Sequence, residues 1–114
     1  MHKVLVVDDH VDVAPMLAGL IIAMGHEARC ARSCEEALPI AQEFRPDTAL
    51  IDISMPTIDG FECARLLREQ VSKKLRLFGM SGYSFQSWRE KPAIFEKYLL
   101  KPVQSKTLTE ILAG

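Results

Sequence analysis

Short apolar runs alternate with segments of helical periodicity along the chain. The first run, Val4-Leu5-Val6-Val7, is mostly β-branched and has charged residues at both ends, which is typical of a strand buried on both faces of a parallel sheet. Apolar residues then recur at spacings of three and four over residues 13–24, a pattern that predicts an amphipathic helix. Gly25 follows this segment and is a suitable residue to end the helix.

The same alternation continues through the rest of the sequence. We predict further strands at residues 27–31, 49–51, 75–80 and 98–100, and further helices at residues 34–44, 61–70, 88–97 and 105–112. Five strands that alternate with five helices predict an α/β fold with a parallel sheet and helices on both of its faces.

Local signals mark the start of two of these helices. Ser33 with Glu36, and Asp59 with Glu62, have the spacing of a capping box. For this reason we interpret Asp59 as a helix cap and not as a ligand. Pro39 lies inside the helix at residues 34–44, where we expect it to remove one backbone hydrogen bond and to kink the helix.

Composition narrows the class of protein. The chain of 114 residues has the length of one domain, is 48% hydrophobic and carries a net charge of −1. We therefore expect residues 1–114 to form a single domain without an output domain, and we expect no direct binding to nucleic acid, which needs a basic field. No apolar stretch is long enough for a membrane span and none resembles a signal peptide, so we expect a soluble, cytoplasmic protein without membrane contact.

The three cysteines, Cys30, Cys34 and Cys63, cannot all pair with one another. They form no C-x-x-C motif and have no metal-ligand spacing relative to the histidines. The simplest interpretation is a reducing, intracellular location with free thiols that serve as small core residues.

Polar side chains stand directly after four of the predicted strands. These residues are Asp8, Asp9, Asp52, Ser81 and Lys101. In open parallel sheets, ligands bind beyond the carboxyl ends of the strands. Three carboxylates at one edge repel each other, and a hard divalent cation such as Mg²⁺ would relieve this repulsion. Lys101 and Ser81 could then hold the oxygens of a phosphoryl group, with Asp52 as the nucleophile.

These residues resemble a response-regulator receiver domain of two-component signalling, over essentially the whole chain. The matching motifs are Asp8-Asp9, Asp52 in D-I-S-M-P-T-I-D-G, Ser81-Gly82, Tyr98 and Lys101-Pro102. The resemblance implies a flavodoxin-like (β/α)5 fold with a doubly wound five-stranded parallel sheet in the strand order 2-1-3-4-5.

The resemblance also implies a role for each site residue. Asp52 would accept a phosphoryl group from the phosphohistidine of a histidine kinase or histidine phosphotransfer protein, and the domain would dephosphorylate itself slowly without being an enzyme in the usual sense. Asp8, Asp9, Asp52 and the backbone carbonyl of Ser54 would hold Mg²⁺ or Mn²⁺. Lys101 and Ser81 would contact the phosphoryl oxygens.

Phosphorylation would act as a switch. Ser81 would move toward the phosphoryl group and Tyr98 would turn inward, so that the face formed by residues 88–100 and 105–112 changes its preference for an output protein or a covalently linked domain. The Lys101-Pro102 bond would be cis. The chain departs from the family pattern at two points. The interval from Ser81 to Lys101 is about two residues shorter, and Ala93-Ile94 replaces the usual alanine-glycine. Both departures fall on the signalling face and not on the acidic pocket.

Two other functions remain open at this point. A metal-dependent phosphatase with an aspartyl nucleophile needs a second acid two residues after the first, but His10 and Val11 stand two residues after Asp8 and Asp9. A receiver-like scaffold that only binds proteins would not need all five motifs. We interpret His10 itself as a surface loop residue.

Overall fold

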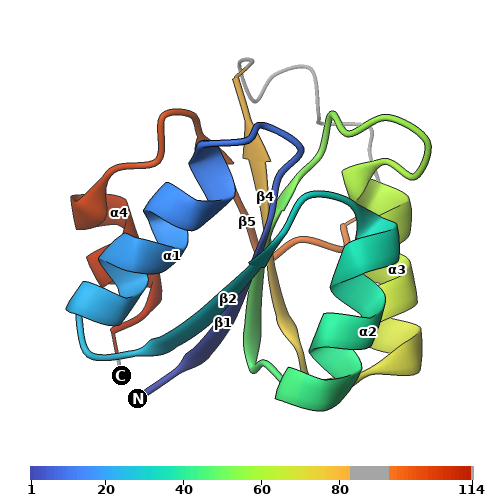
Figure 1. Ribbon diagram of the computed structural model, residues 1–114, viewed down its shortest axis with the longest axis horizontal. Helices are drawn as coiled ribbons and strands as arrows, with labels where there is room; N and C mark the ends of the chain where they lie inside the picture. Colours follow the sequence, from blue (N-terminus) through green and yellow to red (C-terminus); the bar gives the residue numbers. More distant parts are fainter. Residues whose placement is uncertain (83–92, 114) are drawn as a thin grey trace.

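Five parallel strands form one sheet in the order β2-β1-β3-β4-β5 in a computed structural model that describes residues 1–82 and 93–113 (Figure 1). The strands are β1 (Lys3–Val7), β2 (Glu27–Ala31), β3 (Thr48–Asp52), β4 (Arg76–Ser81) and β5 (Lys97–Leu100). The predicted fold class and strand order are therefore confirmed.

Helices cover both faces of this sheet. Helices α1 (Val13–Ala23) and α4 (Ser105–Ile111) lie on one face, and α2 (Cys34–Phe44) and α3 (Gly60–Gln70) lie on the other (Figure 1). Alternate residues of β1 belong to different cores: Val4 and Val6 pack in the core that includes α1 and α4, whereas Leu5 and Val7 pack in the core that includes α2 and α3. The part of a strand that is buried on both faces has to be apolar, as residues 4–7 of β1 are.

The predicted helix starts are confirmed. The Ser33 hydroxyl accepts a hydrogen bond from the Glu36 backbone N–H at 3.1 Å, and the Asp59 carboxylate accepts one from the Glu62 N–H at 2.9 Å. Helix α2 runs from Cys34 to Phe44 and includes Pro39 without a break.

The prediction of a helix at residues 88–97 is wrong in its described part. Residues 88–92 lie outside the described residues, while residues 93–94 form a turn and β5 begins at Lys97. The backbone N–H of Glu96 donates to the Leu77 carbonyl of β4 at 2.7 Å. The backbone groups that a helix would use for its own hydrogen bonds pair with β4 instead, so the strand begins earlier than we predicted.

The expectation of free thiols is wrong for two of the three cysteines. Cys34, at the start of α2, and Cys63, in the first turn of α3, form a disulfide with their Cα atoms 5.6 Å apart. Cys30 is free. The two bonded cysteines are 29 residues apart in the sequence, and they meet because α2 and α3 pack side by side on the same face of the sheet. Among the described helices, none is long and apolar enough to cross a membrane.

Candidate functional site

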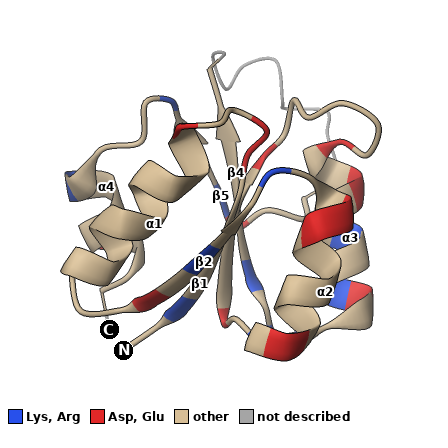
Figure 2. Ribbon diagram, in the orientation of Figure 1, with Lys and Arg blue, Asp and Glu red and all other residues tan. Residues whose placement is uncertain are grey.

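The parallel strands bring the predicted site residues to one edge of the sheet. The register pairs Val7 of β1 with Ile51 of β3, so the next residues, Asp8 and Asp52, lie side by side. Ser81 ends β4, and its carbonyl accepts a hydrogen bond from the Lys101 N–H at 2.7 Å. Acidic segments (red) therefore meet at the ends of β1 and β3 in Figure 2.

The chain reverses tightly after Asp52. A Cβ atom at Gly60 would lie 2.5 Å from the Cα of Ile53 and 2.6 Å from the carbonyl oxygen of Asp52. Only glycine fits this approach of backbone to backbone without a shift of the chain. Gly60 thus allows the start of α3 to lie directly against the end of β3, which fixes the loop that carries Ser54.

Asp8 is fully buried and surrounded by donors. Its Oδ2 lies 2.6 Å from the Lys101 ammonium nitrogen, and its Oδ1 accepts hydrogen bonds from the backbone N–H of His10 at 2.9 Å and from His10 Nδ1 at 2.8 Å. Burial pushes the pKa of Asp8 upward, but Lys101 and the His10 donors together hold this pKa below its usual range. Asp8 is therefore a stable anionic centre of the site.

Asp52 has fewer partners in the same environment. It is 2% exposed, and its Oδ1 accepts a hydrogen bond from the Ser54 backbone N–H at 3.0 Å. Within the described part of the chain, its Oδ2 has no hydrogen-bond partner, and Lys101 Nζ lies 3.5 Å away. Burial and the charge of Asp8 raise the pKa of Asp52 in spite of the Ser54 N–H. Asp52 is consequently the more basic of these two carboxylates.

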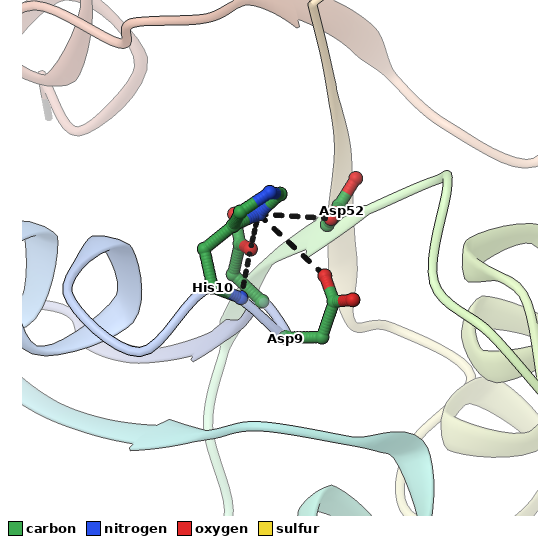
Figure 3. A group of neighbouring side chains, drawn as sticks. Asp9, His10 and Asp52 are labelled. Atoms are coloured by element: carbon green, nitrogen blue, oxygen red, sulfur yellow. Dashed lines mark hydrogen bonds and ion pairs between the residues drawn. The ribbon is translucent and has the colours of Figure 1, made fainter.

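His10 is the site residue that sequence reasoning missed. Its side chain is 66% exposed, as expected for a surface loop, but its ring is turned toward the carboxylates (Figure 3). Besides the Asp8 contact, Nδ1 lies 3.6 Å from Asp9 Oδ1 and 3.9 Å from Asp52 Oδ2. The only signal in the sequence was its position directly after the acidic pair. The hydrogen bond to Asp8 and the charges of Asp8 and Asp9 raise the pKa of His10, although Lys101 opposes them.

The remaining predicted residues lie around this centre. Ser81 is buried at the end of β4, Ser54 is exposed in the loop after β3, and the Lys101–Pro102 peptide bond is cis. Tyr98 is half-buried in β5 and packs against the rings of Phe95 and Phe61, with centroids at 5.6 and 6.5 Å. Part of the expected signalling face, residues 88–92, lies outside the described residues.

The donor set fits a divalent cation. Asp8, Asp9, His10 and Asp52 each offer one ligand atom, and these four atoms lie within 4.8 Å of one another. The buried Asp52 Oδ2, which lacks a hydrogen bond from any described residue, faces this group. A buried carboxylate oxygen without a donor is costly, and a bound cation would compensate for it. A pocket of about 440 Å³ lined by His10, Asp52, Ser54, Gly82 and Lys101 opens beside it and can receive a small anion.

Comparisons with known proteins point to one family. Residues 4–113 match the family model described as the response regulator receiver domain. The chain is 31% identical to the Vibrio cholerae chemotaxis protein CheY4, whose crystal structure superimposes with a TM-score of 0.88 over 98% of this chain and 96% of that chain.

Curated relatives extend this result. The chain is 30% identical over 113 residues to the sensor histidine kinase AtsR of Burkholderia thailandensis. This match covers 96% of the chain and 19% of AtsR. It is 26% identical to the protein PilH of Pseudomonas aeruginosa, with 100% of both chains covered. The chain spans less than half the length of AtsR and of two further curated relatives, with shares of 19%, 48% and 16%.

Proposed function

Because the chain belongs to the response regulator receiver domain family, which receives phosphoryl groups in two-component signalling, we propose that Asp52 is its phosphoacceptor. The donor is the phosphohistidine of a histidine kinase or of a histidine phosphotransfer protein. One observation carries the proposal: the ammonium of Lys101 lies 2.6 Å from Asp8 and 3.5 Å from Asp52, next to a basic, incompletely hydrogen-bonded carboxylate.

The transfer needs little more than positioning and charge stabilisation. A carboxylate oxygen of Asp52 attacks the phosphorus atom; a P–O bond forms, the P–N bond to the donor histidine breaks, and its electron pair stays with the imidazole. The Lys101 ammonium and the Ser81 hydroxyl hold the phosphoryl oxygens. The Ser54 N–H donates to Asp52 Oδ1 and so orients the carboxylate, and Oδ1 keeps a lone pair for attack.

Receiver domains bind Mg²⁺ at an acidic pocket, and here Asp8, Asp9, Asp52 and the Ser54 carbonyl would hold Mg²⁺ or Mn²⁺. When bound, the cation supplies positive charge against the negative charge of the phosphoryl group. Asp8 remains anionic because the Lys101 ammonium lies beside it and the backbone N–H of His10 donates to it, so it retains the charge that a cation needs.

The output of the domain is a change in binding. In the proposed switch, Ser81 moves toward the phosphoryl group and Tyr98 turns inward from its present half-buried position. The face formed by residues 88–100 and 105–112 then changes its preference for an output partner. Residues 1–114 act as one cytoplasmic receiver domain, which slowly dephosphorylates itself and makes no direct contact with nucleic acid or membrane. We do not propose turnover of generic phosphomonoesters, because neither Asp8 nor Asp9 is followed by an acid two positions later.

Intact-mass spectrometry after incubation with acetyl phosphate and Mg²⁺ tests the proposal. We expect one added phosphoryl group on the wild type, and none on Asp52→Asn or in the presence of EDTA. Asp12→Asn is the matched control, because Asp12 is exposed at the start of α1 and its side chain makes no capping hydrogen bond. This variant should be phosphorylated like the wild type.

An adduct that survives in Asp52→Asn would place the phosphoacceptor elsewhere and overturn the assignment. Failure of every condition, including transfer from phosphorylated histidine kinases, would support a scaffold that only binds proteins.

A further inference from the structure

We propose that His10 is a ligand of the divalent cation and that its imidazole shifts the selectivity of the site from Mg²⁺ toward transition-metal dications such as Mn²⁺ and Zn²⁺. The proposal rests on the proposed function, because it assumes that a cation binds between Asp8, Asp9 and Asp52. It goes further by giving the site a nitrogen donor and, with it, a different metal preference.

The position of the His10 ring supports this role. Nδ1 lies 2.8 Å from Asp8 Oδ1, 3.6 Å from Asp9 Oδ1 and 3.9 Å from Asp52 Oδ2 (Figure 3). With metal–ligand bonds of about 2.1 Å, neighbouring ligands of an octahedral ion are about 3.0 Å apart and opposite ligands about 4.2 Å apart. The three separations from Nδ1 fall in or near this interval, and all four ligand atoms lie within 4.8 Å of one another. Shifts of the side chains by a few tenths of an ångström would let one ion contact Nδ1 and all three carboxylates.

A second observation, independent of the ring, points to a cation at the same place. Asp52 Oδ2 is buried and has no hydrogen-bond partner among residues 1–82 and 93–113. It faces His10 Nδ1 and the Lys101 ammonium at 3.9 and 3.5 Å, both beyond hydrogen-bond distance. A cation bound among these atoms would give this oxygen a direct partner.

The backbone holds His10 in position for this role. The N–H of His10 donates to the same Asp8 oxygen that Nδ1 contacts, at 2.9 Å, so the residue is attached to a buried carboxylate at two points. Ligation by Nδ1 requires the tautomer that carries its proton on Nε2. The dication then takes the place of the proton that Nδ1 and Asp8 share.

The expected selectivity follows from the donor atoms. Mg²⁺ prefers oxygen ligands and gains little from an imidazole, whereas the affinity of mixed nitrogen and oxygen sites rises from Mn²⁺ toward Zn²⁺ and Cu²⁺. A site with three carboxylates and one imidazole should therefore bind Zn²⁺ and Mn²⁺ better than a site with carboxylates alone. Replacement of His10 should lower the ratio of Zn²⁺ to Mg²⁺ affinity by about tenfold or more.

Two measurements on the purified chain test this inference. Calorimetric titration with Zn²⁺ and with Mg²⁺ gives the affinity ratio for the wild type and for His10→Asn. Pulsed electron paramagnetic resonance of bound Mn²⁺ shows whether a nitrogen nucleus is coupled to the ion. We expect ¹⁴N coupling in the wild type and its loss in His10→Asn.

His2→Asn is the matched control. His2 Nδ1 also contacts an aspartate, Asp47 Oδ1 at 3.1 Å, but at the opposite edge of the sheet, and it is not part of the four-residue group. This variant should keep both the affinity ratio and the ¹⁴N coupling of the wild type.

An unchanged affinity ratio in His10→Asn, or bound Mn²⁺ without ¹⁴N coupling, would overturn the inference. Tighter binding of both Zn²⁺ and Mg²⁺ by His10→Asn would also overturn it, because His10 would then be a competitor of the cation and not a ligand. Phosphorylation of the wild type by acetyl phosphate with Mg²⁺ separates these results from a failure of the proposed function: an adduct on Asp52 leaves that function intact even if His10 is not a ligand.

Discussion

Asp47 and Asp52 stand at opposite ends of β3, and their surroundings differ. Asp47, just before the strand, accepts hydrogen bonds from the Lys3 N–H at 2.8 Å and the Thr48 hydroxyl at 2.7 Å, and His2 Nδ1 lies 3.1 Å away. Asp52, the last residue of the strand, is almost fully buried and, among the described residues, accepts a single hydrogen bond, from the Ser54 N–H. Figure 2 shows acidic segments at both edges, and among residues 1–82 and 93–113 it is the edge of Asp52 that brings three carboxylates close together.

This difference separates a structural carboxylate from a reactive one. The donors around Asp47 tie β1, β3 and the N-terminus together and hold the pKa of Asp47 below its usual range, although burial opposes them. Around Asp52, burial and a neighbouring anion raise the pKa and leave one oxygen without a donor. Buried polar groups without partners lower stability, and proteins tolerate them at functional sites.

Among the substitutions considered, replacement of Lys101 should change the free energy of unfolding most. In Lys101→Met, buried Asp8 loses the ammonium at 2.6 Å, and Asp52 loses the same positive charge at 3.5 Å. Because two buried carboxylates then lack this compensating charge, we expect the free energy of unfolding to fall by about 3 kcal/mol. Urea unfolding measures the loss. Lys106→Met, an exposed change at the start of α4, is the control and should stay within about 0.5 kcal/mol of the wild type.

The double variant Lys101→Met/Asp8→Asn sharpens this prediction. If an uncompensated charge at Asp8 causes the loss, the second substitution should recover part of it. A single variant Lys101→Met as stable as the wild type would mean that the carboxylates do not depend on the lysine.

Substitutions at the two ends of β3 should change stability in opposite directions. Asp47→Ala removes the partner of the buried Thr48 hydroxyl and should cost about 2 kcal/mol. Asp52→Asn removes one of the carboxylate charges at the site while its side-chain oxygen can still accept from Ser54, and should stabilise the fold by about 1 kcal/mol. Urea unfolding in EDTA at pH 7 compares both with the wild type. Two losses of equal size would remove the distinction between the two ends.

The sequence predicted much of this edge because buried parallel strands have a clear pattern. The apolar runs at residues 4–7, 49–51 and 98–100 each stop at a charged residue, so Asp8, Asp52 and Lys101 marked strand ends. Parallel pairing alone brings such ends together. The orientation of the His10 ring was not predictable in this way, because it depends on a loop conformation and on contacts with residues from another strand. The Cys34–Cys63 bond was missed for the same reason: the packing of α2 on α3, and not a sequence motif, brings these two cysteines together.

The pH dependence of stability should distinguish the two aspartates by the sign of the contribution that their ionised forms make. The pKa of Asp47 is lowered in the folded protein, so its stabilising contribution is present above its ordinary value of 3.8 and is lost as the pH falls through the folded pKa. The deficit of Asp47→Ala should therefore shrink at low pH. The pKa of Asp52 is raised, so the folded state binds its proton more tightly and stability is lost as the pH rises from 3.8 through the folded pKa.

The stability gain of Asp52→Asn should accordingly be absent at pH 3, appear as the pH rises, and reach its full size at neutral pH. Urea unfolding of the wild type and both variants in EDTA at pH 3, 5 and 7 gives the two difference curves. The deficit and the gain should both grow with pH, because ionised Asp47 stabilises the fold while ionised Asp52 destabilises it. A gain of Asp52→Asn that is independent of pH would mean that shape, and not the charge of the carboxylate, distinguishes the reactive end of β3 from the structural one.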